Sequence, residues 1–184
     1  ELHDSITSIE KYSFSGCSSL VEIEIPTNIR FISEGTFYGC SKLQSIEIKE
    51  NIESIGKFSF KGCSSLLEVK IPKTVEVIEE GSFSNCSSIT KIKINSQIKV
   101  ISDNTFSGCS CLSEIVIPSS VKLIGKHAFA DCTSLQKIII PNEVESICEN
   151  AFSGCVKLEE IEINESLQVI KSFAFSRCNS LKKI

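Results

Sequence analysis

The stretch FSGCSSLVEIEIP, residues 14–26, decides the fold because similar stretches recur along the chain. Some residues differ between the copies, but the spacing of the apolar residues, the Gly and the Cys does not change. It appears again as FYGCSKLQSIEIK at 37–49, FKGCSSLLEVKIP at 60–72 and FSGCSCLSEIVIP at 106–118. The step is 23 residues, or twice that between the last two, and eight periods of 23 account for all 184 residues. A fixed period of about 20 to 50 residues is the signature of a stacked array. The sequence therefore predicts a solenoid of eight windings.

Two residue types keep this period without an insertion or deletion. A phenylalanine recurs once in each repeat, and eight of the ten cysteines follow three residues behind it. The phenylalanines are Phe14, Phe37, Phe60, Phe83, Phe106, Phe129, Phe152 and Phe175, and the cysteines are Cys17, Cys40, Cys63, Cys86, Cys109, Cys132, Cys155 and Cys178.

Within one repeat, the apolar pattern predicts a strand followed by a turn. Ile23 and Ile25 alternate with Glu, which is typical of a strand with one buried face, and Pro26 then ends the strand because it has no backbone donor. The later SEGTFYGC stretch (33–40) is expected to form a tight turn or one helical turn. Its last glycine is replaced in other repeats only by Asn85, Asp131 and Arg177. Since Gly, Asn and Asp tolerate positive φ, we expect a left-handed residue here in most repeats, with Arg177 as the exception.

The burial of apolar side chains within a single repeat cannot offset the entropy cost of ordering its backbone. Stability must therefore come from contacts between neighbouring windings. Stacked strands would pair at about 4.8 Å, with Phe on Phe and Ile on Ile. We predict one β-rich solenoid domain of the α/β class over residues 1–184, with a parallel β-sheet on one face. Leu2 and Ile184 fall on core positions and no polar cap is visible, so we expect the chain to be part of a longer array.

The cysteines suggest a ladder of reduced thiols more than disulfides or a metal site. In-register neighbours would hold their Cβ atoms near 4.8 Å, whereas a disulfide needs about 3.5 to 4.5 Å. A free Cys also behaves as a small buried hydrophobe. Disulfides and metal binding stay open as lesser alternatives. Cys111 and Cys148 lie outside the ladder, and exposed, oxidisable thiols compete there with chance substitution.

Catalysis and cofactor binding find little support in the sequence. His3 and His127 are the two histidines, and no nucleophile or acid recurs beside them. No C-x-x-C pair, GxGxxG or Walker-type loop is present, so we expect no enzyme activity, metal or cofactor. The net charge is −4 with both signs interspersed, which gives no electrostatic reason to expect nucleic acid or an anionic membrane as partner.

The outward positions of the predicted strands form the candidate binding face. Along this face the side chains run from acidic through basic to apolar and back to acidic. An exposed apolar pair beside clustered charge is typical of a contact site, while cross-strand ion pairing on a solvated sheet is the competing interpretation. The predicted partner-binding residues are Lys70, Lys91, Lys93, Val116 and Ile139.

The stretch LSEIVIPSSVKLIGKHAFADC, from Leu112 to Cys132, resembles the BspA-like subclass of leucine-rich repeats, whose pattern is LxxIxIPxxVxxIgxxAFxgC. The resemblance covers the whole chain and implies a leucine-rich-repeat solenoid. Members of that family occur in oral and gut bacteria and in anaerobic protists. Many are surface or secreted proteins implicated in adhesion to extracellular-matrix proteins, host cells and other microbes.

We therefore expect a non-enzymatic module that binds a protein or glycoprotein at the cell surface or outside the cell. One alternative is a structural protein whose repeats stack end to end into fibres or a larger scaffold. Another, favoured by reduced thiols, is an intracellular signalling scaffold. The sequons at Asn85 and Asn164 are sites for glycosylation if the protein is eukaryotic and secreted.

Overall fold

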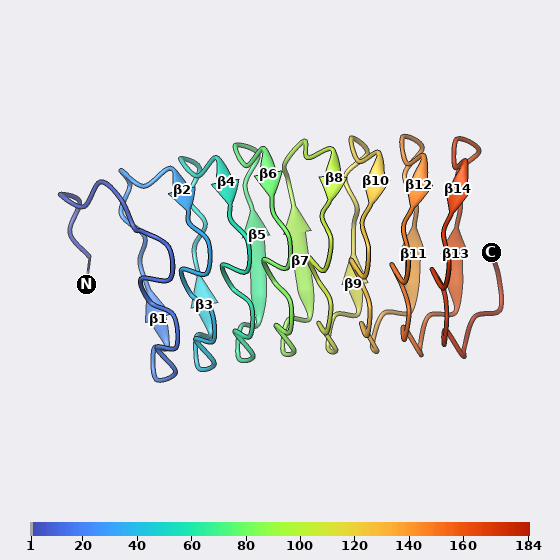
Figure 1. The fold of residues 1–184 in the computed structure, drawn as a ribbon, viewed down its shortest axis with the longest axis horizontal. Coiled ribbons are helices and arrows are strands. Elements are labelled where there is room, and N and C mark those ends of the chain that lie inside the picture. The colour runs from blue at the N-terminus through green and yellow to red at the C-terminus, as the bar shows by residue number, and fades with distance from the viewer. Residues whose placement is uncertain (1) are drawn as a thin grey trace.

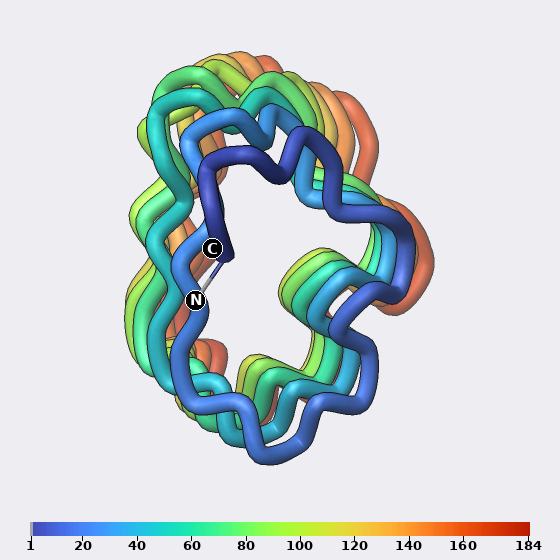
Figure 2. The backbone as a smooth tube through the Cα atoms, turned by 90° about the vertical axis from the view of Figure 1, so that its left-hand side faces the viewer, coloured from blue at the N-terminus to red at the C-terminus, as the bar shows by residue number. Residues whose placement is uncertain are grey.

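The computed structural model describes residues 2–184 as a stack of similar windings with two columns of short parallel strands (Figure 1). Viewed along the stack, successive windings lie over one another (Figure 2). The first column contains β1 (Glu22–Ile23), β3 (Ser45–Ile46), β5 (Glu68–Ile71), β7 (Lys91–Ile94), β9 (Glu114–Ile115), β11 (Lys137–Ile139) and β13 (Glu160–Glu162). The second contains β2 (Phe31–Ile32), β4 (Ser54–Ile55), β6 (Val77–Ile78), β8 (Val100–Ile101), β10 (Leu123–Ile124), β12 (Ser146–Ile147) and β14 (Val169–Ile170).

Every strand pair is parallel and joins residues one repeat apart. Val69 pairs with Ile92 in the first column, and Ile124 pairs with Ile147 in the second. The first column divides into three sheets, β1-β3, β5-β7-β9 and β11-β13, and the second into β2-β4-β6 and β8-β10-β12-β14. The 23-residue period of the sequence is thus the register of the sheets.

The third side of each winding is a chain of turns. Its N–H groups alternate between a carbonyl three residues back and a carbonyl of the next winding. Thr36 and Tyr38 donate to Ser33 and Gly35 within the turn, while Phe37 donates 2.7 Å to the Ser59 carbonyl one winding ahead. The alternation repeats along the stack, so the turns join neighbouring windings as a sheet edge would.

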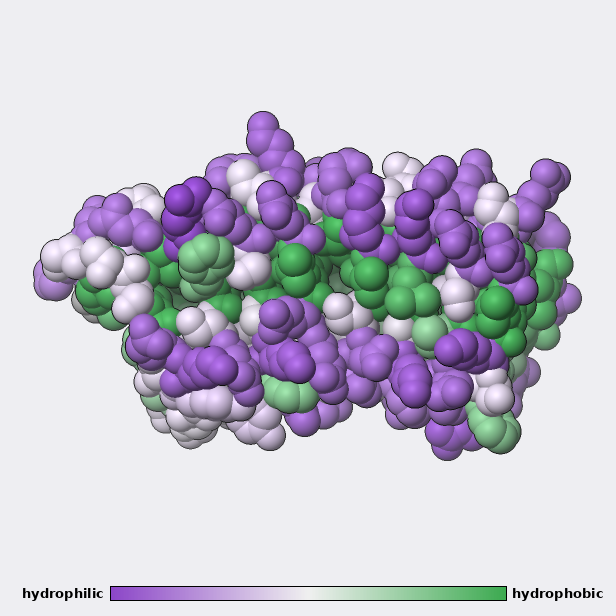
Figure 3. Space-filling model, turned by 45° about the horizontal axis from the view of Figure 1, so that its top comes forward, coloured by the Kyte–Doolittle hydropathy of each residue, from purple (hydrophilic) through white to green (hydrophobic). Residues whose placement is uncertain are grey.

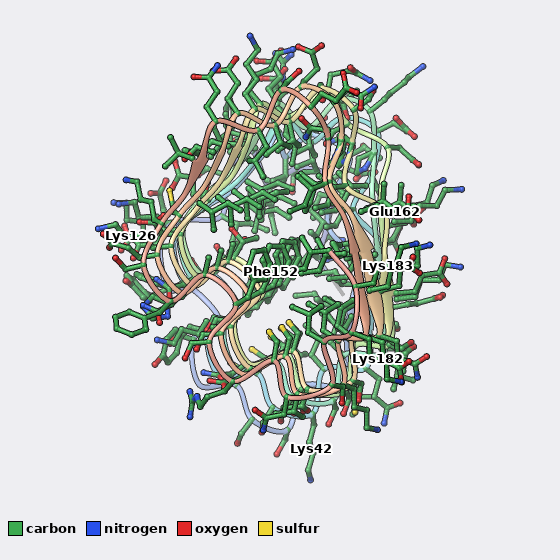
Figure 4. All side chains as sticks on the ribbon, turned by 90° about the vertical axis from the view of Figure 1, so that its right-hand side faces the viewer. Lys42, Lys126, Phe152, Glu162, Lys182 and Lys183 are labelled. Atoms are coloured by element: carbon green, nitrogen blue, oxygen red, sulfur yellow. The ribbon has the colours of Figure 1, made fainter. Side chains whose placement is uncertain are left out.

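The phenylalanines form one continuous stack inside the solenoid. Ring centroids of successive members from Phe14 to Phe175 lie 5.1 to 5.8 Å apart, and their planes differ by at most 23°. The six inner rings are fully buried (Figure 4, where Phe152 is labelled). This contact confirms the stacking of equivalent positions that the period predicts.

Two details of the predicted fold need correction. The sequence predicted one parallel sheet and, at residues 33–40, a tight turn or one helical turn. A second strand column is present, and the stretch forms turns, with no helix among residues 2–184. Two left-handed residues explain why no helix forms. Gly35 and Gly39 both have positive φ, and the three residues between them are fewer than one turn of an α-helix needs. The prediction of eight windings also exceeds the seven strands that each column contains.

The left-handed position behind each phenylalanine is occupied as expected. Arg177, predicted to be an exception, adopts the same conformation with φ 58°. The sequence analysis missed a second left-handed column four residues earlier, where the residues are Tyr12, Gly35, Phe58, Gly81, Asn104, His127, Asn150 and Phe173.

Candidate functional site

The outward side chains of the first strand column form the candidate site, which we call the strand face (Figure 4, labelled by Glu162 and Lys183). Alternation places Val69 in the core and Glu68 and Lys70 in solvent, as the sequence pattern predicts. The buried partner of each strand fixes the direction of its outward neighbours. The face is therefore a rigid display of side chains in columns one winding apart.

Three of the predicted binding residues are lysines in the middle of this face. Lys70 and Lys93 are directly opposite each other in the β5–β7 register, and both are exposed. Neither makes an ion pair within residues 2–184. Lys91 differs, because its Nζ lies 3.8 Å from a carboxylate oxygen of Glu114 on β9. The structure thus brings the predicted basic cluster together and leaves two of its charges without an ion-pair partner among residues 2–184.

The predicted apolar pair continues the same column. Val116 is 70% exposed and Ile139 is 55% exposed, one winding further along. Val116 lies just past the end of β9, and β9 and β11 belong to different sheets. The lysines and the apolar pair therefore lie on one face in the expected order.

A shallow depression accompanies the basic cluster. It has a volume of about 570 Å³, and its walls are outward residues and loop ends of β3, β5 and β7, including Glu47, Lys70 and Lys93. Its charged lining residues and open shape suit contact with a side chain or segment of a macromolecule better than an enclosed small ligand.

Further along the strand face, charges neutralise one another. Lys137 contacts Glu160, with 3.2 Å between their charged atoms, and also Glu162. Lys183 contacts the other carboxylate oxygen of Glu160 at 2.9 Å. Hydrogen bonds from Lys183 and Lys137 lower the pKa of Glu160, and bonds to Glu162 and Glu160 raise the pKa of Lys137. This end of the face is internally paired, unlike its basic middle.

The thiol ladder is a structural feature and all ten cysteines are free. Each ladder thiol beyond the first donates a hydrogen bond to a phenylalanine carbonyl of the preceding winding, such as Cys63 Sγ to Phe37 O at 3.2 Å. Burial raises the pKa of Cys40 to about 11 and the pKa values of Cys63 and Cys109 to about 12. At neutral pH these inner thiols are protonated and poorly nucleophilic.

The remaining residues singled out in the sequence are scattered. Cys111 is exposed, but Cys148 is only 7% exposed, so the idea that both are accessible is wrong for Cys148. Cys148 follows Ile147 at the end of β12, and its N–H donates to the Ile124 carbonyl of the preceding winding. Asn85 is exposed, whereas the side-chain amide of Asn164 is bound to the carbonyls of Pro141 and Val144.

A second surface feature escaped the sequence analysis. The outward residue of each second-column strand is apolar in five of seven windings, which gives a hydrophobic band along the molecule between two hydrophilic bands (Figure 3). The apolar residues recur at multiples of 23 positions in the sequence. They can be recognised as a surface band only once they are known to lie in strands and to point outward. The band consists of Phe31, Ser54, Val77, Val100, Leu123, Ser146 and Val169.

A solenoid with two columns of parallel strands, turns on its third side and one stacked phenylalanine in each repeat has the architecture of a leucine-rich-repeat protein. The family model for the BspA type leucine-rich repeat region matches residues 1–113 and 99–184 in six copies, slightly fewer than the eight sequence periods. The chain belongs to this family. No curated protein sequence matches it.

Solved structures share the fold. A leucine-rich repeat protein from Bacteroides ovatus is 31% identical over 98% of this chain and 52% of its own, with a TM-score of 0.77. The T. pallidum leucine-rich repeat protein is 27% identical over 94% of this chain and 81% of its own, with a TM-score of 0.81. A leucine-rich cell surface protein from Faecalibacterium prausnitzii is 23% identical over 96% of this chain and 62% of its own, with a TM-score of 0.52. This chain thus spans about half the length of the B. ovatus protein.

Proposed function

We propose that this chain is a non-enzymatic binding module of a cell-surface or secreted protein, and that its strand face attaches to a host or extracellular-matrix macromolecule. The observation that carries the proposal is the unpaired Lys70–Lys93 pair, held in register beside two exposed apolar side chains. Like charges directly opposite each other weaken a sheet. Their presence on a face that pairs its charges elsewhere is explained by a ligand that supplies the missing acidic groups.

The surface location is supported by the family and by its neighbours. Repeat proteins use extended strand faces for macromolecular contact. One structural neighbour is itself named a cell surface protein. No segment of residues 2–184 forms a helix of the length and apolarity needed to cross a bilayer.

The test is a binding assay with immobilised collagen, fibronectin and laminin. The variant Lys70→Glu, Lys93→Glu, Val116→Glu and Ile139→Glu should lose at least tenfold in affinity, because it removes the basic pair and the apolar pair together. The matched control makes the same exchanges at or next to the second strand column, at Lys99, Lys122, Val77 and Val100. If both variants bind equally well and their circular dichroism is unchanged, the strand face is not the binding site.

Stacking of windings end to end into fibres stays a second prediction. Light scattering against protein concentration separates it from adhesion, since fibres grow in length with concentration while an adhesion module does not.

A further inference from the structure

The charges on the first half of the strand face are segregated by sign, winding by winding. The windings of β1 and β3 present outward glutamates, and those of β5 and β7 present outward lysines. The exceptions are Lys49, which forms an ion pair with Glu24 at 2.8 Å, and Glu68. The glutamates are Glu22, Glu24, Glu47 and Glu50, and the lysines are Lys70, Lys73, Lys91 and Lys93, all of them exposed.

Ion pairs between neighbouring windings are few on this half of the face. On the other sides of the molecule such pairs join several windings, as between Lys11 and Glu34 at 2.9 Å and between Lys126 and Glu149 at 3.2 Å. Among the eight charges of this half, only Glu24 and Lys91 have an ion-pair partner within residues 2–184. The other six make no ion pair among these residues, although Glu47 and Glu50 lie one winding from Lys70 and Lys73.

A second copy of the chain can meet all of them. Consider two strand faces pressed together about a two-fold axis that lies in the interface, parallel to the strands and between β3 and β5. Such an axis keeps each column opposite the same column and reverses the order of windings. Each glutamate of one copy then faces a lysine of the other. The facing pairs are Glu22 with Lys91, Glu24 with Lys93, Glu47 with Lys70 and Glu50 with Lys73, each formed twice.

The same arrangement brings no like charges together within these columns. Glu68 faces Ser45, and Lys49 faces Pro72. The depression of about 570 Å³ lies over β3, β5 and β7, so the long Glu47 and Lys70 side chains have room to extend across the centre. Val116 and Ile139 lie outside the four overlapping windings and stay accessible. Lys70 and Lys93 lie inside them, so a second copy and the ligand of the proposed function compete for these two lysines.

We propose that the first half of the strand face is a self-complementary interface, through which two copies of this chain associate with their windings in opposite order. The contact spans four windings, or roughly 20 Å at about 4.8 Å per winding. That length gives an area at the low end of specific interfaces, about 1,200 Å² or less, so the dimer is weak. Because ion pairs dominate it, added salt dissociates it.

The experiment uses two variants that are each self-repelling and mutually complementary. Glu24→Lys with Glu47→Lys makes the central column entirely basic over four windings, and Lys70→Glu with Lys93→Glu makes it entirely acidic. By sedimentation velocity at low salt, wild type should dimerise, each variant alone should be monomeric, and their equimolar mixture should dimerise again. A combined variant with all four exchanges restores the complementarity and should dimerise by itself.

The result that overturns the proposal is a monomeric wild type at low salt and millimolar concentration, or a mixture that stays monomeric while wild type dimerises. The proposed adhesive function is tested separately, by Val116→Glu with Ile139→Glu. This pair should lower ligand binding and leave dimerisation unchanged. Exchange of Lys99→Glu and Lys122→Glu, on the other side of the molecule, is the control that should leave the dimer intact.

Discussion

Single residues in this fold are constrained by the winding next to them. Gly35 has φ 61°, and a Cβ placed on it would lie 2.1 Å from the ring of Tyr12 in the preceding winding. Gly39 has φ 71°, and the nearest atom to its Cβ would be 3.9 Å away. Phe58 covers Gly81 in the same manner as Tyr12 covers Gly35. A large left-handed residue therefore requires a glycine one winding further on at these two places.

Replacing each glycine by alanine separates the two constraints. Gly39→Ala should lose about 1 to 2 kcal/mol from left-handed strain alone, while Gly35→Ala should lose more because the Tyr12 ring must also move. Urea unfolding measures both. Adding Tyr12→Ala to Gly35→Ala should bring its loss close to that of Gly39→Ala, and equal losses in the two single variants would contradict the steric account.

At the scale of elements, the thiol ladder links stability to alkaline pH. The ordinary thiol pKa is about 9, and burial raises the pKa of Cys63 and Cys109 to about 12. Below pH 9 both folded and unfolded chains hold the proton, so the ladder's contribution is fully present. As pH rises toward 12, the unfolded chain loses these protons first, and folding weakens by about 1.4 kcal/mol per pH unit for each fully buried thiol.

The expected outcome is a free energy of unfolding that falls between pH 9 and 11 in wild type. Cys63→Ala with Cys109→Ala lowers stability at pH 7 but should flatten this decline, because two titrating groups are gone. Denaturant titrations at several pH values check it, and identical slopes in the two proteins would count against the ladder as the cause.

Elements of the fold were predictable from the sequence where one residue type recurs at a fixed spacing. The phenylalanine period gave the stack, and the alternation around Ile23 and Ile25 gave the first strand column. The second column was missed because its buried residues, such as Ile29 and Ile32, are three apart in sequence, so no alternation marks a strand there. The lysine cluster was predictable by column counting, whereas the absence of acidic partners for Lys70 and Lys93 needed side-chain geometry.

For the whole molecule, stability is a sum of contacts between neighbours. Phe106 is fully buried between Phe83 and Phe129, at centroid distances of 5.8 and 5.4 Å. Phe14 is only partly buried and stacks on Phe37 alone within the described chain.

Phe106→Ala should therefore lose about 3 to 5 kcal/mol, the usual range for a fully buried aromatic residue, and Phe14→Ala distinctly less. Thermal unfolding compares them. Hydrogen exchange should locate the Phe106→Ala loss in the windings on both sides of it, and a uniform loss along the chain would argue against nearest-neighbour coupling.

The opposed directions of the backbone hydrogen bonds have an electrical consequence. Turn N–H groups point forward along the stack, as from Phe37 to Ser59, while those beside the second strand column point back, as from Gly56 to Ile32. Their peptide dipoles oppose one another along the long axis, so the windings do not add up to the macrodipole that aligned peptides give an α-helix. The orientation of this molecule in an electric field should follow its side-chain charges, and exchanging a few surface lysines and glutamates should turn its dipole without touching the backbone.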